Sequence, residues 1–318
     1  MRARTLVAAV AAFGFAFSPP LATPSTAPAG AAAPAAPGIT SPQADCPIAD
    51  AELWATRPID TSSCDADGEG DAAHRAQNLA KNNLCAGGFL TSNPQTSALA
   101  TQLTFRKLQA AADDIREEHD LGPQTVPDDR APFGGDVHTT TEGDALGEGS
   151  LVRYVGFLVE GHFSGEEGVN CGRTNQENYD IHLAFSNTKP SLTITKAQGE
   201  ALECRSITAE IIPRRRPDGW MLLGSMKKTS AKGVRAAQEK IDAHGLRRPL
   251  RITGQLFFDG SHQVCGDGGR VGGNPARSSN WEIHPVYAID VCEFITASNC
   301  RWDDDSVWTP LHTWLEDE

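Results

Sequence analysis

The sequence has few long apolar segments. The longest apolar run, Leu6–Phe17, is too short to cross a bilayer, which takes about 20 residues, and it follows Arg2 and Arg4. A basic start followed by a short apolar run is typical of a secretory signal peptide. We therefore predict a signal peptide over residues 1–29, an Ala/Pro-rich linker over residues 30–43, and a secreted or periplasmic product without a transmembrane segment.

C-x-x-C pairs are also missing. The eight cysteines lie far apart, at positions 46, 64, 85, 171, 204, 265, 292 and 300. This spacing argues against a structural zinc site of the zinc-finger type. An even number of cysteines in an exported chain favours disulfides, although eight cysteines allow on the order of a hundred pairings. We expect Cys171, Cys204, Cys265 and Cys292 all to be oxidised.

Positive charge is scarce, since the formal net charge is −13. That weakens nucleic acid as the default ligand, because phosphate binding needs concentrated cations. The charge is nevertheless uneven. Residues 205–251 contain twelve Lys and Arg against four Asp and Glu, whereas residues 294–318 are expected to form an acidic tail. The run Arg214, Arg215 and Arg216 reads first as an exposed basic turn and second as an anion-binding flank.

Two familiar catalytic signatures are absent. No G-x-S-x-G sequence surrounds Ser261, and the glycine-rich stretch 265–269 lacks the lysine of a phosphate-binding P-loop. The sequence therefore offers no complete catalytic set of these two types.

The hydrophobic periodicity changes near residue 150. Upstream, helical spacing predicts helices over residues 73–83 and 97–119, in a Cys-containing loop and helical N-terminal region spanning residues 44–149. Downstream, a period of two predicts strands at residues 150–164, 179–185, 205–213, 250–258 and 281–292. A helix over residues 220–243 falls between the third and fourth strands.

This order predicts a mainly β domain within an α+β chain. Residues 150–293 should form a closed or nearly closed, antiparallel, five-stranded OB-like Greek-key barrel, with the small helical region before it. A small α+β sheet with the same element order is the alternative.

Three acid-x-His pairs lie on the predicted strands: Glu160 with His162, Asp180 with His182, and Glu282 with His284. Successive side chains of a strand point to opposite faces. The apolar neighbours of these pairs account for the barrel core, so the polar alternates should gather on the outer surface of one sheet. Separate hydrogen-bonded pairs of structural importance are the alternative interpretation.

Imidazole and carboxylate groups together suit Zn, Mn, Fe, Ni or Cu, so the cluster predicts one divalent metal ion. The candidate ligands are His162, Asp180, His182, Glu282 and His284, and the second-tier candidates are Glu160, Glu210, Asp259 and His262. A ligating histidine should donate its other ring N–H to a carboxylate or carbonyl.

Several blocks carry a resemblance: V-N-C at 169–171, D-I-H at 180–182, G-Q-L-F-F-D at 254–259, S-H at 261–262, and residues 281–292. Together they resemble an uncharacterised family of exported bacterial proteins, over about residues 78–292. The resemblance implies an OB-like fold and no particular reaction.

Two functions fit these features. The first is an exported OB-like binding module whose ligand is an anionic polymer or a protein, with any metal serving structure. The alternative is a secreted metal-dependent hydrolase of the phosphodiesterase or nuclease type, with the ion activating water and the arginine run offsetting substrate charge. We favour the binding module because a complete catalytic set is missing.

Overall fold

The computed structural model describes residues 64–65, 67–82, 97–213, 216–266 and 276–316. The predicted signal peptide and linker, together with Cys46, Cys85, Arg214 and Arg215, lie outside these residues. The strands are β1 (Ala98–Ala100), β2 (His138–Thr139), β3 (Ala145–Leu146), β4 (Leu151–Phe163), β5 (Ile181–Ser186), β6 (Ile207–Ile211), β7 (Leu250–Phe258), β8 (Trp281–Cys292) and β9 (Trp308–Pro310). The helices are α1 (Ala72–Asn82), α2 (Gln102–Glu118), α3 (Lys196–Glu203), α4 (Val234–Ala243) and α5 (Leu311–Glu316), with short 3-10 helices that include η3 (Gly168–Asn170) and η6 (Asp218–Ser225).

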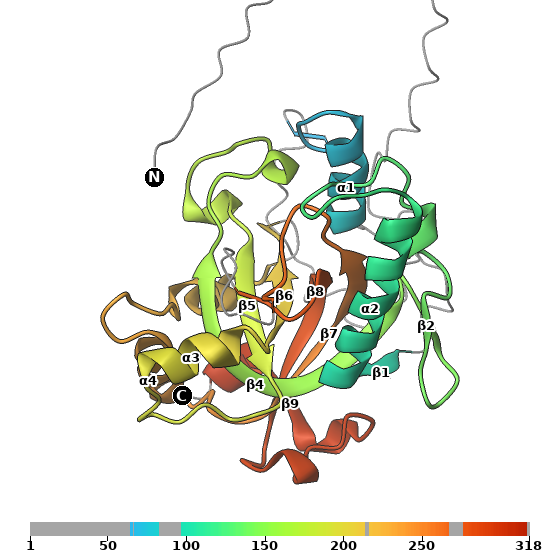
Figure 1. Ribbon diagram of the computed structural model, residues 1–318. Helices are drawn as coiled ribbons and strands as arrows, with labels where there is room; N and C mark the ends of the chain where they lie inside the picture. The colour runs from blue at the N-terminus through green and yellow to red at the C-terminus, as the bar shows by residue number, and fades with distance from the viewer. Residues whose placement is uncertain (1–63, 66, 83–96, 214–215, 267–275, 317–318) are drawn as a thin grey trace, which may run out of the picture. The chain divides into compact units, whose positions relative to one another are not determined.

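Five of the strands close into a barrel (Figure 1). Going round it, β4 pairs with β5, β5 with β6, β6 with β8, β8 with β7, and β7 with β4 again. The long strand β4 closes the barrel because its first half pairs with β7 and its second half with β5, with a register shift between Leu158 and Glu160. This confirms the predicted five-stranded OB-like barrel. The prediction that every pair is antiparallel is wrong, because β6 and β8 run parallel.

The alternating apolar residues fill the barrel as predicted. Ile181 and Leu183 of β5, Ala209 of β6, and Trp281 and Ile283 of β8 are fully buried in one hydrophobic cluster. The indole of Trp281 also donates a hydrogen bond of 2.9 Å to the carbonyl of Leu108, which ties α2 to the barrel. Parity within each strand therefore determines which side chains face away from the core.

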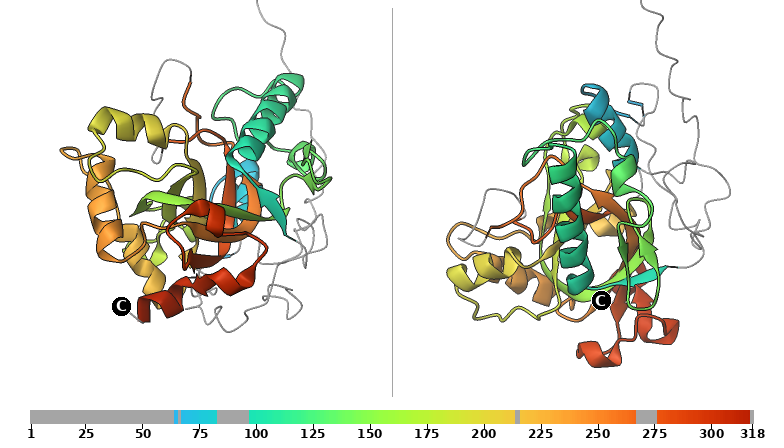
Figure 2. Two further views of the ribbon diagram at one scale, coloured as in Figure 1. Left: turned by 90° about the horizontal axis from the view of Figure 1, so that it is seen from below. Right: turned by 45° about the vertical axis from the view of Figure 1, so that its right-hand side comes forward.

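The helices differ from the prediction in three places. The segment predicted as a helix over 97–119 begins with β1 and becomes helical only after Thr101, whose hydroxyl caps α2. The predicted helix over 220–243 is broken into η6 and α4, and Gly233 before α4 has a φ of +56°. Helix α3 was not predicted; Thr195 caps it by accepting from the Gln198 N–H. Helices α3 and α4 lie side by side at the edge of the barrel (Figures 1 and 2).

The segment expected to be an acidic tail is largely folded. Strand β9 pairs with β8, and Leu311 of α5 is fully buried in the main core. Arg251 on β7 forms ion pairs with Asp290 of β8 and with Asp305, which precedes β9. These contacts make the C-terminal segment part of the same folded unit as the barrel.

Three disulfides are present in the described chain: Cys64–Cys171 and Cys204–Cys265 join distant segments, and Cys292–Cys300 closes a short loop after β8. The prediction that Cys171, Cys204, Cys265 and Cys292 are oxidised is confirmed. Among the residues described, no helix is long and apolar enough to span a membrane.

Candidate metal centre

The polar side chains that alternate with the core residues gather on the outer face of the barrel. That face is buried rather than exposed to solvent. The exposed fractions are 0% for Asp180, Glu282 and His284, 1% for Glu210 and 5% for His182. Helix α1 contacts β8 and η3, and it brings Lys81 over the cluster. The polar face is therefore buried, because the N-terminal region covers it.

The sheet register explains why these side chains meet. His162 lies directly opposite His182 in the β4–β5 pair, and His182 lies opposite Glu210 in the β5–β6 pair. In the parallel β6–β8 pair, Ala209 matches Ile283, so Glu210 and His284 are the next residues along each strand. The four side chains thus form one row across four neighbouring strands.

Asp180, Glu210 and His284 form the tightest group. They offer one ligand atom each, and these atoms all lie within 4.8 Å of one another. His284 Nε2 is 3.0 Å from Glu210 Oε2 and 3.7 Å from Asp180 Oδ2. Two ligand atoms that bind one ion at about 2.1 Å are about 3.0–3.4 Å apart, so the spacing approaches that of a coordination shell. This group could hold a metal ion.

These atoms contact one another as ion pairs, but among the described residues they lack hydrogen bonds of acceptable geometry. Asp180 Oδ2, Glu210 Oε2 and both ring nitrogens of His284 are buried without a partner of acceptable hydrogen-bond geometry. Buried polar atoms are normally hydrogen-bonded, and leaving one unsatisfied costs about 1–3 kcal/mol. A bound cation would coordinate these converging oxygen and nitrogen atoms and so satisfy them. The expectation that His284 donates its second N–H is not met among the described residues.

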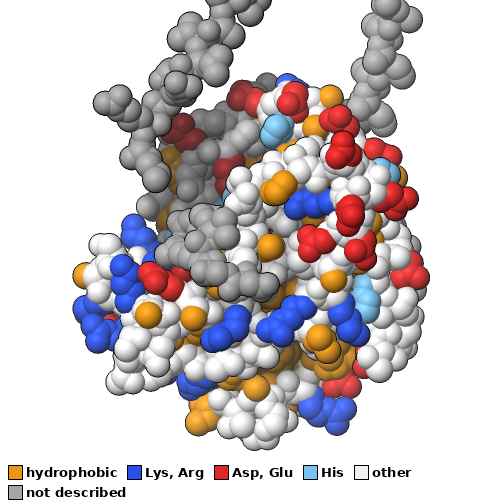
Figure 3. Space-filling view, in the orientation of Figure 1, with side chains coloured by type: hydrophobic (Ala, Val, Ile, Leu, Met, Phe, Trp, Pro, Cys, Tyr) orange, Lys and Arg blue, Asp and Glu red, His pale blue; other side chains and the backbone are white. Residues whose placement is uncertain are grey.

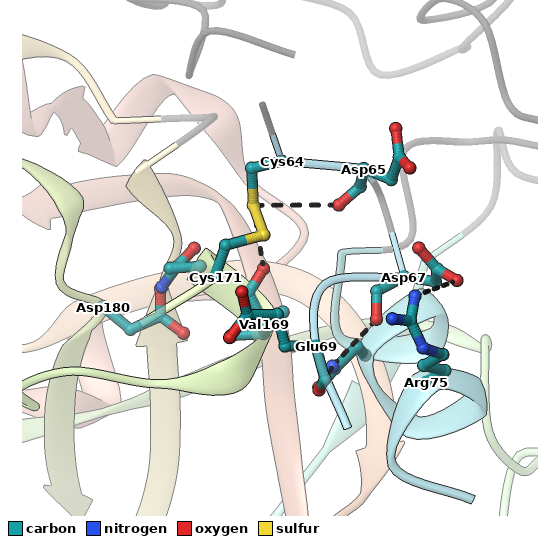
Figure 4. Close-up of a disulfide and its surroundings, with 10 residues drawn as sticks. Cys64, Asp65, Asp67, Glu69, Arg75, Val169, Cys171 and Asp180 are labelled. Carbon is teal, nitrogen blue, oxygen red and sulfur yellow. Dashed lines mark hydrogen bonds and ion pairs between the residues drawn. A yellow bond between two sulfur atoms is a disulfide. The ribbon is translucent and has the colours of Figure 1, made fainter. Parts of the chain in front are cut away.

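A hydrogen bond and a disulfide hold Asp180 in place. Asn170 of η3 donates from Nδ2 to Asp180 Oδ1 over 2.9 Å, which leaves Oδ2 directed to the group. The next residue, Cys171, is linked to Cys64 (Figure 4). In that view Asp180 lies on the opposite side of the disulfide from Asp67 and Arg75. The β4–β5 loop, residues 164–180, is thus fastened directly beside the candidate ligand.

Positive groups balance the buried carboxylates. Lys81 Nζ lies 3.4 Å from Glu167 Oε2 and 3.9 Å from Glu210 Oε2. His182 Nε2 lies 3.3 Å from a carboxylate oxygen of each of the same two residues. Burial alone would lower the pKa of His182, but the charges of Glu210 and Glu167 outweigh it and raise the pKa to about 9.

The carboxylates shift in the complementary direction. Burial would raise the pKa of Glu167, but Lys81 and His182 hold it at about 2. The pKa of Glu210 also falls well below its ordinary value, because His182 and Lys81 outweigh the effect of burial. Both carboxylates are therefore ionised at neutral pH, the form that binds a cation.

Glu282 and His162 lie beside the triad rather than in it. Glu282 forms a close ion pair with Arg277, which also contacts Asp259 at 3.0 Å. The His162 ring packs edge-on against that of His182, with centroids 5.4 Å apart. Two of the five predicted ligands, Asp180 and His284, thus fall in the tightest group, and the third member, Glu210, was a second-tier candidate.

The other second-tier residues have different partners. Asp259 binds the Nδ1 of His262, whose side chain is one-third exposed. Glu160 pairs with Lys228, which also reaches Glu203 at 2.9 Å.

Of the predicted anion-binding arginines, only Arg216 is described. Its guanidinium donates to the backbone carbonyls of Gln176, Glu177 and Tyr179. Arg216 therefore braces the β4–β5 loop and is not a free anion site.

Four residues of this region were not found from the sequence: Lys81, Glu167, Asn170 and Arg277. They come from a helix and two loops, where strand parity gives no information. The one available signal was the V-N-C block at 169–171, which contains Asn170.

Comparison of this chain with protein families, with curated proteins and with solved structures found no match.

Proposed function

We propose that this protein is an exported OB-like binding module in which Asp180, Glu210 and His284 hold one divalent cation. The observation that carries the proposal is the convergence of buried ligand atoms from three different elements that lack a hydrogen bond of acceptable geometry among the described residues. Two carboxylates and one imidazole suit Zn²⁺, Mn²⁺ or Fe²⁺. The signal-like N-terminus and the three disulfides support export.

The proposed ion has a structural role. A catalytic metal keeps a position open to substrate, whereas these three ligands are 0–1% exposed. The ion would join β6 and β8 to Asp180 at the end of the β4–β5 loop. It would also add positive charge to that of Lys81 of α1, so that the carboxylates of the loop and of the barrel can share one buried space. The ligand of the module is an anionic polymer, which binds elsewhere on the barrel.

Isothermal titration calorimetry on the mature chain, made without a His tag and stripped with a chelator, tests the cation site. We expect one Zn²⁺ or Mn²⁺ per chain for the native protein and none for Glu210→Gln or His284→Ala. His312→Ala on α5 is the matched control and should bind as the native chain does. Equal binding by all four proteins would exclude the triad as the site.

A second function has one specific observation in its favour. Asp259 is fully buried and holds the Nδ1 of His262, whose imidazole is one-third exposed. A carboxylate that orients a histidine in this way is the arrangement of a general base. A hydrolase of the phosphodiesterase type would use His262 to activate water.

Hydrolysis of a chromogenic phosphodiester separates the two functions. A metal-dependent rate that His262→Gln removes, while the metal remains bound, would favour the hydrolase. A rate equal to that of buffer alone would favour the binding module.

A further inference from the structure

A cavity of about 610 Å³ opens beside the candidate metal site. Its walls come from the end of β4, the β4–β5 loop, and residues within 224–240, which run from the end of η6 into α4. His162 lines it and packs at its back against His182, which contacts Glu210. The cavity therefore reaches, through two imidazoles, the row of side chains that contains the candidate ligands.

The cavity is basic in an otherwise acidic chain. Lys227, Lys228 and Lys240 line it against a single carboxylate, Glu160, although the whole chain carries −13. Lys228 is engaged with Glu160 and Glu203, and Lys240 donates one hydrogen bond of 2.6 Å to the Ser225 carbonyl, whereas Lys227 is exposed. On the face drawn in Figure 3, basic side chains lie mainly over the lower half and acidic side chains mainly over the upper right. Local charge of this kind attracts an anion.

Aromatic side chains complete the cavity. Tyr179, partly exposed at the end of the β4–β5 loop, and Phe163, at the end of β4, both line it. The Phe163 ring already has Arg216 at 6.0 Å from its centroid and Gly224 against its edge, so it forms a fixed apolar wall. Tyr179 is the ring that remains available to a ligand. A basic groove with an aromatic side chain is how proteins hold unpaired nucleotides.

We propose that this cavity binds a single-stranded nucleic acid, with Lys227 and Lys240 contacting phosphates and Tyr179 stacking on a base. A pocket of this volume holds about one or two nucleotides. Unpaired bases are required, because a paired base does not expose its face for stacking. The inference rests on the proposed function, in which the module binds an anionic polymer, and it identifies that polymer as single-stranded nucleic acid. It does not depend on the metal.

Fluorescence anisotropy with a labelled oligothymidylate of about 12 nucleotides tests the inference on the full mature chain. We expect Lys227→Glu to weaken binding about tenfold and to reduce the salt dependence by about one phosphate contact. Tyr179→Leu should weaken binding about tenfold through lost stacking. Inorganic phosphate should compete, and a duplex of the same length should bind more weakly.

Lys107→Glu is the matched control. Lys107 is exposed on α2 and does not line the cavity, so this substitution makes the same charge change at a distance from it. It should alter binding less than about twofold, since only the long-range field changes. Equal losses in Lys227→Glu and Lys107→Glu would overturn the inference. So would tight binding of heparin by a chain that ignores the oligonucleotide, which would point to a sulfated polysaccharide.

The same proteins separate this inference from the metal proposal. Lys227→Glu should still bind one cation, and oligonucleotide binding should persist in a chelator. A native chain that binds the oligonucleotide but no metal would refute only the cation site. A chain that binds metal but no oligonucleotide would refute only the present inference.

Discussion

Lys81 and the proposed cation neutralise the same buried carboxylates. Removing the lysine should therefore make the stability of the chain depend more strongly on the cation. Lys81 is 9% exposed, and its Nζ lies 3.4 Å from Glu167 and 3.9 Å from Glu210. Replacing it with methionine keeps most of the volume but leaves buried negative charge uncompensated. Breaking a buried ion pair in this way costs about 3–5 kcal/mol. We expect Lys81→Met to lose that much free energy of unfolding in a chelator.

A divalent cation should restore part of the loss. At a free concentration of about 100 times its Kd, the ion stabilises the native chain by about 2.7 kcal/mol. Lys81→Met should bind the ion more tightly, because a positive charge about 4 Å from a ligand oxygen has gone, and each tenfold gain in affinity adds about 1.4 kcal/mol. The difference in stability between the two proteins should therefore shrink by at least about 1 kcal/mol when metal is added.

Urea denaturation followed by circular dichroism, with chelator and with Zn²⁺ or Mn²⁺, measures both quantities. Lys81→Arg keeps the charge and should lose less than Lys81→Met does. Lys107→Met, on the exposed face of α2, is the control for a lost lysine and should stay within about 0.5 kcal/mol of the native chain. A stability difference that is unchanged or larger in metal would refute the reasoning.

Three other predictions concern export, the disulfide beside the site, and pH. N-terminal sequencing of secreted protein should place the mature start between Ala22 and Ala36; intact Met1 on exported protein would contradict this. Removing the Cys64–Cys171 disulfide with two serines should cost about 2–5 kcal/mol and weaken metal binding, because it frees the loop beside Asp180; unchanged metal affinity would oppose that link. Burial raises the pKa of Asp290 above 3.8 in spite of Arg251, so the folded chain loses stability as pH rises from 3.8 through the raised pKa. Over that pH window the free energy of unfolding of Asp290→Asn should rise relative to that of the native protein, as urea titrations at several pH values would show. A difference in stability that does not change with pH would contradict the shift.

Alternation alone was enough to predict the barrel. Each barrel strand places its apolar residues on one face, and the helical insertion expected between the third and fourth barrel strands is present as η6 and α4, whereas α3 between the second and third was not expected. The parallel pairing of β6 with β8 could not be read from periodicity, since parallel and antiparallel strands alternate alike. The break between η6 and α4 falls in the polar segment 227–233, which was wrongly included in one helix, and Gly233 at its end has a left-handed φ of +56°.

Strand alternation predicted only part of the candidate site, namely which side chains of each strand lie on the polar face. Parity placed Asp180, His182 and His284 on one face, and their proximity follows from the register. It could not show that α1 covers this face, because the contact between Lys81 and Glu210 joins segments far apart in sequence. Glu210 was ranked too low because the ranking relied on acid-x-His pairs, and no histidine lies near Glu210 along β6. The resemblance to an exported bacterial family stays a prediction.

The most direct measurement is a crystal structure of the mature chain grown with Zn²⁺ or Mn²⁺, with anomalous data collected at the metal edge. We predict one anomalous peak, about 2.0–2.2 Å from His284 Nε2 and from a carboxylate oxygen of Asp180 and of Glu210. A density map with no peak inside this triad, at a cation concentration that saturates binding in solution, would contradict the account.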